Sequence, residues 1–353
     1  MRSWSTLGPG ITWMIGMLIL SFFAYLFPDW RHLQIAASSP CCLYFSYYWL
    51  LPESLTWLSS KPNLRGQLEA EAGRATRCNK IAETISLDNY YEDKDFVDLS
   101  SHLSARDVLM SLIRTPLLVI YSVVMCFLWF TDCLVYYGLS MFSTDLAGDP
   151  YISFALSALI ELPSYFALSV AYERLGRQRT TIITHGLAGA VLIILAFVPS
   201  KTDNGTSLSG LIIALLLFGK FNISLSYMGL ALYGSELFPT TLRTISGGMT
   251  NIAARFGGIL APYVGLVASV SKSIPPLIFG ILSIATALLT FLLPETRGME
   301  LLVTADDDIP ISPTLRRCCC CCSLVRTKSS RSKTRNVKLC DSNLINYNSN
   351  DVQ

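Results

Sequence analysis

Residues 116–141 read PLLVIYSVVMCFLWFTDCLVYYGLSM, and this stretch decides the fold class. It carries one charged side chain, Asp132, among aromatic and aliphatic residues. About twenty apolar residues in a helix, rising ~1.5 Å each, cross the ~30 Å hydrocarbon core of a bilayer. Because lipid offers no hydrogen bonds to the backbone, such a segment must satisfy its own and so forms a helix. The stretch is predicted to be a transmembrane helix.

Seven further stretches show the same scarcity of charge: residues 10–28, 33–52, 151–172, 180–200, 208–235, 244–270 and 274–294. Only 15% of the whole chain is charged, whereas a soluble chain usually has about a quarter. The net charge of +2 is too small to favour nucleic acid as a partner. The sequence therefore predicts an all-α membrane protein with about eight transmembrane helices, whose main partner is the lipid bilayer.

The polar intervals divide the chain into four parts. Residues 1–52 hold two predicted helices, and residues 53–115 form a polar loop with one helix-like, charge-bearing stretch at 64–84. Residues 116–294 hold the other six helices as one bundle. Residues 295–353 form a basic, cysteine-rich tail.

The distribution of Lys and Arg predicts the orientation in the membrane. With both termini in the cytoplasm, the outer loops hold only Arg31, Lys201 and Lys272, as the positive-inside rule requires. The same orientation places Asn204, in an Asn-Gly-Thr acceptor triplet, outside, where it can be glycosylated.

The tail contains five consecutive cysteines next to two arginines, in a compartment where disulfides are rare. Metal sites need spaced ligands, so S-palmitoylation beside a basic patch is the functional interpretation and an inert run is the alternative. The cysteines are Cys318, Cys319, Cys320, Cys321 and Cys322.

The segments between the predicted helices resemble signatures of the major facilitator superfamily. PESLTWL at 52–58, ERLGRQR at 173–179, ELFPTTLR at 236–243 and PETRG at 294–298 are similar to PESPRWL, GRxGRR, ELYPTxxR and PETKG. Thr56 stands where that family has Arg. The loop residues that the resemblance marks as gating positions are Glu53, Arg174, Gly176, Arg177, Glu236 and Arg243.

Finer matches resemble the organic cation, carnitine and anion transporters of solute carrier family twenty-two. They are IRTP at 113–116, WF at 129–130, YYGL at 136–139, LAGD at 146–149, SALIELP at 157–163 and GK at 219–220. The resemblance implies a partial major-facilitator fold, with the eight spans corresponding to helices five to twelve of twelve. Helices one to four are expected to be absent.

Ionisable residues inside spans are costly and mark functional sites by default. The resemblance implies that Glu161 faces the central cavity and attracts a cation; pairing with another helix is the alternative. Arg255 stands where anion and carnitine transporters have arginine, and it can clamp a carboxylate, with a structural ion pair as the alternative. Lys220 is expected to pair with Glu161. Asp132 lies outside the pattern.

Aromatic rings in the same spans can hold a cation on their faces, with ordinary helix packing as the alternative. Trp129 and Tyr136 are two turns apart on one helical face, which predicts that both reach the cavity. The resemblance adds Tyr137 and Tyr227. His185 has no partner at useful spacing and is predicted to be a core residue.

The sequence contains no nucleophile elbow, phosphate-binding glycine loop or spaced metal ligands, so neither an enzyme nor a cofactor is predicted. The leading hypothesis is transport of small organic cations or carnitine-like zwitterions across the plasma membrane by alternating access. One alternative is an inactive or regulatory truncated form that associates with a full-length homologue. The others are an organic anion porter and a sugar porter.

Overall fold

The structure is a computed structural model. It describes residues 7–50, 52–53, 58, 64–78, 110, 112–144, 150–199, 208–269, 271–299 and 310–314. Every regular element in these ranges is a helix, which confirms the predicted all-α class. The chain divides into two compact units, residues 19–111 and residues 1–18 together with 112–353. Asn204 and the five consecutive cysteines of the tail lie outside the described residues.

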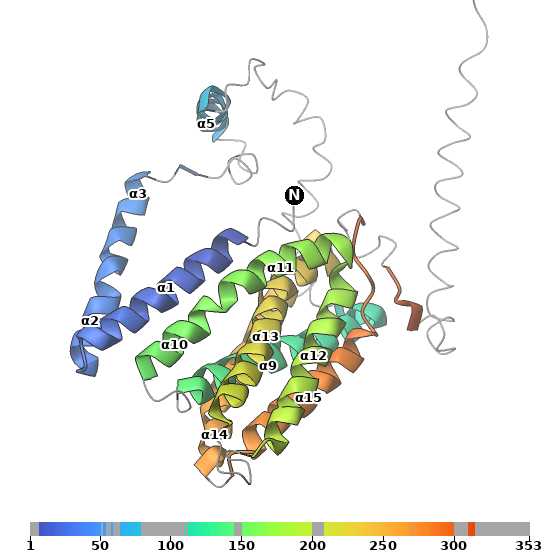
Figure 1. The fold of residues 1–353 in the computed structure, drawn as a ribbon. Helices are drawn as coiled ribbons and strands as arrows, with labels where there is room; N and C mark the ends of the chain where they lie inside the picture. The colour runs from blue at the N-terminus through green and yellow to red at the C-terminus, as the bar shows by residue number, and fades with distance from the viewer. Residues whose placement is uncertain are drawn as a thin grey trace, which may run out of the picture. The chain divides into compact units, whose positions relative to one another are not determined.

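The larger unit is a bundle of long helices joined by short connections (Figure 1). Helix α14 packs most extensively on α9, and α12 packs on both α15 and α13, while α11 lies against α13. The bundle helices are α9 (Pro116–Thr144), α10 (Pro150–Leu159), α11 (Glu161–Arg174), α12 (Arg177–Phe197), α13 (Ser209–Leu237), α14 (Thr240–Leu266) and α15 (Ile274–Thr290). The same unit includes the first residues of α1 (Leu7–Leu26).

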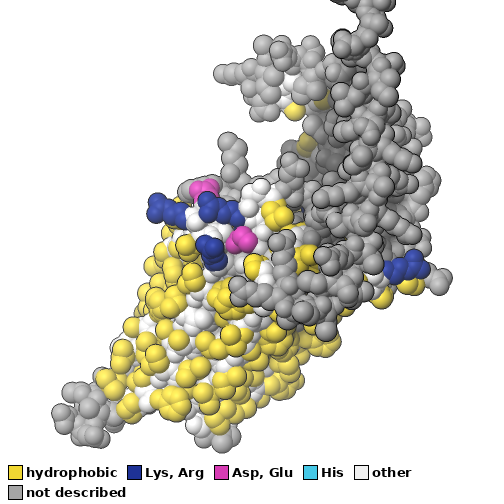
Figure 2. Space-filling view, turned by 90° about the vertical axis from the view of Figure 1, so that its right-hand side faces the viewer, with side chains coloured by type: hydrophobic (Ala, Val, Ile, Leu, Met, Phe, Trp, Pro, Cys, Tyr) yellow, Lys and Arg dark blue, Asp and Glu magenta, His cyan; other side chains and the backbone are white. Residues whose placement is uncertain are grey.

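Six described helical segments are long and apolar enough to cross a membrane, and α15, at 17 residues, is a shorter apolar helix. Figure 2 shows the corresponding surface, on which hydrophobic side chains cover most of the described face and the charged ones gather at one end. The six are Leu7–Leu26, Pro116–Phe142, Pro150–Arg174, Arg177–Phe197, Ser209–Leu237 and Leu242–Ser269. The chain is therefore a multi-pass membrane protein.

The stretch predicted as a single span over 33–52 is the exception. It is divided among α2 (Trp30–Ser38), the 3₁₀ helix η2 (Ser39–Ser46) and α3 (Tyr47–Leu50). Asp29 caps α2 by accepting a hydrogen bond from the backbone N–H of Arg31, and Pro40 stands in the first turn of η2. Since proline has no N–H to donate to the carbonyl four residues earlier, the α-helical hydrogen bonding of α2 is not continued through Pro40, although Ser39 keeps helical dihedral angles. The prediction of one unbroken helix was wrong.

One predicted span is interrupted at Ile160, next to Glu161. Helices α10 and α11 are separated by Ile160 alone, and Glu161 is the first residue of α11. Pro163 cannot donate the backbone hydrogen bond that would tie it to the residue four positions earlier, which explains a bend at this point. The bend places Glu161 at a helix start, fully buried inside the bundle.

Glycines allow two pairs of bundle helices to approach closely. A Cβ at Gly257 in α14 would collide with the backbone carbonyl of Phe130 in α9. A Cβ at Gly138 in α9 would collide with the ring of Phe279 in α15. Small residues at helix crossings stabilise bundles in lipid, because close backbone approach replaces the missing hydrophobic driving force. These contacts fix α9 between α14 and α15.

The smaller unit also contains an amphipathic element. Helix α5 (Arg65–Cys78) lies within the helix-like stretch predicted at 64–84. Leu68 is buried, while Arg74 and Glu71 form an exposed ion pair at 2.9 Å. One turn apart, these two side chains stabilise the helix by a few tenths of a kcal/mol.

Candidate substrate site

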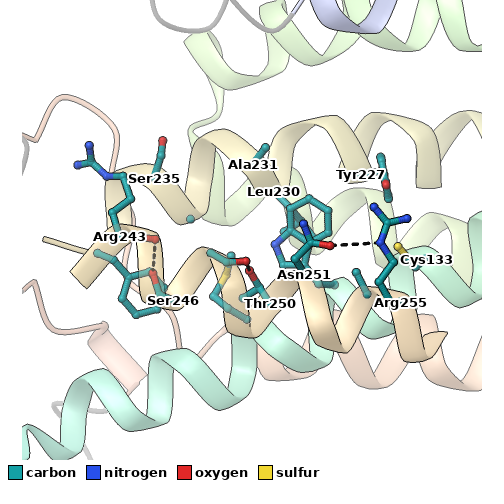
Figure 3. Close-up of a pocket in the computed structure, with 16 residues that line it drawn as sticks. Cys133, Tyr227, Leu230, Ala231, Ser235, Arg243, Ser246, Thr250, Asn251 and Arg255 are labelled. Atoms are coloured by element: carbon teal, nitrogen blue, oxygen red, sulfur yellow. Dashed lines mark hydrogen bonds between the residues drawn. The ribbon is translucent and has the colours of Figure 1, made fainter. Parts of the chain in front are cut away.

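A pocket of about 340 Å³ lies between α9, α13 and α14 (Figure 3). Helix α14 supplies a row of polar side chains that recurs at helical spacing and ends in a guanidinium at each end of the pocket. None of the side chains that line it is acidic. The lining residues of α14 are Arg243, Ser246, Gly247, Thr250, Asn251, Ala254 and Arg255.

The two arginines of the pocket differ in their surroundings. The Arg255 Nε donates to Asn251 Oδ1 at 3.3 Å, and its guanidinium lies beside Tyr227 and Cys133. Arg243 lies at the other end, and its Nε and Nη2 are buried without a hydrogen-bond partner among the described residues. Twelve residues of helix separate them, about 18 Å along the axis. The two arginines therefore stand at opposite ends of the pocket.

An aromatic chain leads from the pocket into the bundle. The rings of Trp129 and Tyr227, which both line the pocket, meet edge to face with centroids 5.5 Å apart. The Tyr227 ring stacks on Tyr136 at 5.3 Å, and Tyr136 meets Tyr137 edge to face at 5.4 Å. Trp129 and Tyr136 both contact Tyr227 and so share one face of α9, but neither Tyr136 nor Tyr137 is among the residues that line the pocket.

Behind Tyr136 lies a fully buried charge pair. Glu161 accepts hydrogen bonds from the hydroxyls of Tyr136 at 2.7 Å and Tyr165 at 2.8 Å. Lys220 Nζ lies 3.4 Å from Glu161 Oε1, so the ion pair expected from the sequence is present. The same ammonium lies 4.8 Å from the centre of the Tyr136 ring. Glu161 does not line the pocket, and Tyr136 connects it to the pocket residue Tyr227.

Four partners of this charge pair were not singled out from the sequence. Lys220 donates to Ser140 at 2.8 Å and to Ser157 at 2.6 Å, and the indole of Trp13 in α1 donates to the Tyr136 hydroxyl at 3.0 Å. Tyr165 stands four residues after Glu161, one helical turn, and this spacing could have identified it. Ser157 stands one turn before Glu161, within the SALIELP motif, whereas Ser140 and Trp13 come from distant parts of the chain and no local pattern marks them.

A second buried polar cluster corrects the prediction for His185. That residue is a core residue, as predicted, but it does have partners: its Nε2 lies 3.0 Å from Asp132 Oδ1 on α9, and its Nδ1 lies 3.0 Å from the carbonyl oxygen of Thr181. Ser226 on α13 donates to Asp132 Oδ2 at 3.0 Å. The Thr181 contact lies one turn away within α12, but the contacts with Asp132 and Ser226 join three different helices and could not be found from sequence spacing.

Two of the loop-motif residues, Arg177 and Glu236, pair at the end of the bundle where α11 gives way to α12. Arg177 donates two parallel hydrogen bonds of 2.8 Å to Glu236 at the end of α13, and Thr296 donates to the same carboxylate at 2.8 Å. Bidentate pairing of this kind is among the strongest polar contacts in proteins. It ties α12, α13 and the segment after α15 together.

The neighbouring loop positions complete this arrangement. Gly176 has a φ of 95°, and a Cβ there would strike the carboxylate of Glu295, which accepts from the backbone N–H of Arg177 at 2.8 Å. The exposed Arg174 accepts on its carbonyl oxygen from Arg297 at 2.7 Å. Glu53 belongs to the smaller unit, where it is exposed.

Comparisons with known proteins agree with this architecture. The model of the Major Facilitator Superfamily matches residues 2–262. The chain is 34% identical over 298 residues to the organic cation transporter protein of Drosophila melanogaster, covering 83% of this chain and 53% of that one. It is 31% identical over 302 residues to human organic cation/carnitine transporter 2, covering 86% of this chain and 52% of that one.

A solved structure shows the same fold. The proton:xylose symporter XylE aligns with a TM-score of 0.59 at 18% sequence identity, covering 85% of this chain and 65% of that one. The chain spans about half the length of the curated relatives it matches, in agreement with the resemblance to the later helices of the family. With its apolar helices, its loop motifs and its match to the family model, the chain belongs to the major facilitator superfamily.

Proposed function

We propose that this chain takes part in the transport of small zwitterions of the carnitine type, in the plasma membrane and with both termini in the cytoplasm. The observation that carries the proposal is the juxtaposition of Arg255 with Trp129 and Tyr227 in one pocket. Guanidinium forks bind carboxylates bidentately, and aromatic faces attract quaternary ammonium groups. A carnitine-like molecule carries both groups on one short skeleton.

The distribution of charge favours a zwitterion over a simple cation. Glu161, the carboxylate expected to attract a cation, is fully buried and 3.4 Å from Lys220. Its charge is therefore balanced inside the protein, and the pocket itself is lined by two arginines and by no acid. A ligand that offers a carboxylate to Arg255 gains more from this pocket than one that carries only positive charge.

Alternating access supplies the expected mechanism. Major-facilitator proteins bind substrate between two bundles and rock one bundle against the other around the site. In this chain, the Arg177–Glu236 pair joins α12 to α13, and the glycine contacts join α9 to α14 and α15; these contacts support a bundle that moves as a unit. Membership of the major facilitator superfamily supports a transport role over a catalytic one.

A second candidate is a regulatory subunit that associates with a longer homologue. Two observations support it: the chain spans about half the length of its relatives, and α14 exposes a row of large apolar side chains. These are Ile252, Phe256, Ile259 and Tyr263, each more than half exposed. An organic anion porter is a third candidate, supported by the two arginines of the pocket.

Uptake by the purified chain in proteoliposomes tests these candidates. Carnitine, tetraethylammonium and hippurate represent a zwitterion, a cation and an anion, and empty vesicles provide the baseline. The proposal expects saturable carnitine uptake above that baseline, with the other two transported less well. Preferred uptake of hippurate would support the anion porter, and preferred uptake of tetraethylammonium would contradict the proposal.

If none of the three enters, co-expression with human organic cation/carnitine transporter 2 tests the regulatory candidate. That candidate expects the two chains to co-purify and expects the carnitine transport of the longer protein to change. No uptake and no association would exclude both functions for this chain.

A further inference from the structure

The buried cluster of Asp132, His185 and Ser226 takes no part in the pocket or in the Glu161–Lys220 pair. Its three residues come from α9, α12 and α13 and have exposed fractions of 0%, 0% and 2%. Placing an ionisable pair inside a membrane-spanning bundle is costly, so a structural role that any apolar pair could fill is a poor explanation for it.

The hydrogen bonds of His185 determine where its protons lie. Its Nδ1 is 3.0 Å from the carbonyl oxygen of Thr181, which can only accept, so Nδ1 carries a proton. Ser226 Oγ lies 3.3 Å from the same nitrogen and donates its own proton to Asp132 Oδ2 at 3.0 Å. The second ring nitrogen, Nε2, is then the one that faces the carboxylate.

The Nε2–Oδ1 contact is the part of the cluster that can gain or lose a proton. These atoms lie 3.0 Å apart, out of line for a hydrogen bond, and neither has a hydrogen-bond partner among the described residues. With a neutral imidazole and an ionised Asp132, two lone pairs face each other and the pair carries a net charge of −1. Binding one proton between the two groups brings that charge to zero.

The cluster lies directly behind the wall of the pocket. Asp132 precedes Cys133 on α9, and Ser226 precedes Tyr227 on α13; Cys133 and Tyr227 line the pocket. A change of one charge in this position acts on the pocket through low-dielectric protein, where electrostatic effects are strong. The affinity of Arg255 for a carboxylate therefore depends on whether the proton is bound.

Few other ionisable groups surround the cluster. Helix α15 contributes none, and the single titratable side chain of α10, Tyr151, is exposed at the start of that helix. The nearby groups are Cys133 on α9, Tyr172 on α11, Tyr227 on α13 and, across the pocket, Arg255 on α14.

We propose that Asp132 and His185, held by Ser226, form a proton-binding site whose occupancy is linked to ligand binding in the adjacent pocket. The link to a ligand rests on the proposed function, whereas the proton site does not. Linkage is reciprocal: if the proton changes ligand affinity, then the ligand changes proton affinity by the same factor.

Nuclear magnetic resonance of the histidine ring nitrogens tests the proton site. The chain has three histidines, so the double variant His32→Gln/His102→Gln leaves His185 as the single signal. We expect the ¹⁵N shifts of the labelled full chain in nanodiscs to change with pH as a single proton binds to the cluster. Shifts that do not change with pH would overturn the proposal.

Variants of Asp132 and Ser226 show whether the titration of His185 depends on the other members of the cluster. In Asp132→Asn the change of the His185 shifts with pH should disappear, because the proton is shared with the lost carboxylate. Ser226→Ala keeps the carboxylate and removes one hydrogen bond to it, so the midpoint should move while the titration persists. If Asp132→Asn does not fold, Ser226→Ala still tests the proton site. A titration that is identical in all three chains would overturn the assignment.

The link to the pocket is measured separately, as the affinity for carnitine at about pH 5.5 and at about pH 8. We expect a several-fold difference in the parent chain and none in Asp132→Asn, whereas His32→Gln, a histidine in the smaller unit, should retain it. Carnitine binding that is independent of pH would overturn the link. No carnitine binding at any pH would overturn the proposed function, and the ring-nitrogen titration would still decide the proton site.

Discussion

At the scale of single residues, Arg255 carries the proposed ligand recognition. Its guanidinium sits in the pocket beside an aromatic pair, with a single hydrogen bond to Asn251. The other N–H groups of the Arg255 guanidinium are therefore left to donate to a ligand. Lysine would keep the charge but present a single ammonium in place of a planar fork.

We expect Arg255→Gln to weaken carnitine binding by about 10- to 100-fold, the effect of removing a charge-assisted pair. Arg255→Lys should give an intermediate loss. The dissociation constant of labelled carnitine in nanodiscs measures both. Lys272→Gln, which removes an exposed cation outside the pocket, is the matched control and should bind as the parent does. An unchanged affinity in Arg255→Gln would place the carboxylate elsewhere.

Glu161 and Lys220 form one ion pair, so the effects of their variants on the unfolding free energy should not be additive. Glu161→Gln leaves the Lys220 ammonium buried without a counter-charge and should cost about 3–5 kcal/mol of unfolding free energy. The double variant Glu161→Gln/Lys220→Met removes both charges and should be less destabilised than the sum of the singles. Equilibrium unfolding in mixed micelles measures each chain.

The exposed Glu173 offers a control for these charge changes, and Glu173→Gln should change the unfolding free energy by no more than about 0.5 kcal/mol. Additive effects of the two single variants would contradict the view that Glu161 and Lys220 interact directly.

At the scale of elements, the packing of α14 on α9 depends on Gly257. Gly257→Ala forces a methyl group against the carbonyl of Phe130, and backbone cannot move aside as a flexible side chain can. We expect a loss of about 1–3 kcal/mol in unfolding free energy and a widened pocket, since both helices line it.

The same helix contains the control. Gly248 has open space around its Cα, so Gly248→Ala should be neutral or more stable by up to about 1 kcal/mol through helix propensity. Denaturation midpoints of the two variants, compared in the same micelles, distinguish the effect of crowding from that of losing a glycine. Equal midpoints would contradict the close approach of α9 and α14.

The broken segment 33–52 and the bend at Ile160 show how far element boundaries follow from the sequence. Both were predicted as single apolar stretches, because hydropathy measures composition and is blind to where a backbone hydrogen bond is lost. Proline stands near both interruptions. Residues 150–174 still form one helical segment of membrane length, whereas the segment 33–52 contains no helix that long. The surrounding packing decides whether a proline bends a helix or ends it.

At the scale of the whole molecule, the orientation in the membrane is open to a direct test. If the loop between α12 and α13 faces outward, Asn204 should be glycosylated in microsomes, and the mass shift should disappear on endoglycosidase treatment. Asn204→Gln should abolish the shift. Asn222→Gln should preserve it, because Asn222 is buried in α13 and cannot reach the transferase.

An acceptor triplet inserted beside Lys272 checks the same orientation independently, since one further pair of helices returns the chain to the same side. Modification of this site but not of Asn204 would show that the first acceptor is merely too close to the membrane. Modification of neither would contradict the proposed orientation.

The sequence by itself determined the class of the protein, its membrane helices apart from the segment 33–52, its family and the residues of the aromatic chain. Charge scarcity, helical spacing and loop motifs are local properties, so they can be read along the chain. The pairing of Glu161 with Lys220 was expected from the family resemblance and is present. Only the tertiary structure decided that Arg177 clamps Glu236 and that His185 meets Asp132. Each of these contacts joins helices far apart in sequence, and burial in a low-dielectric interior makes them decisive.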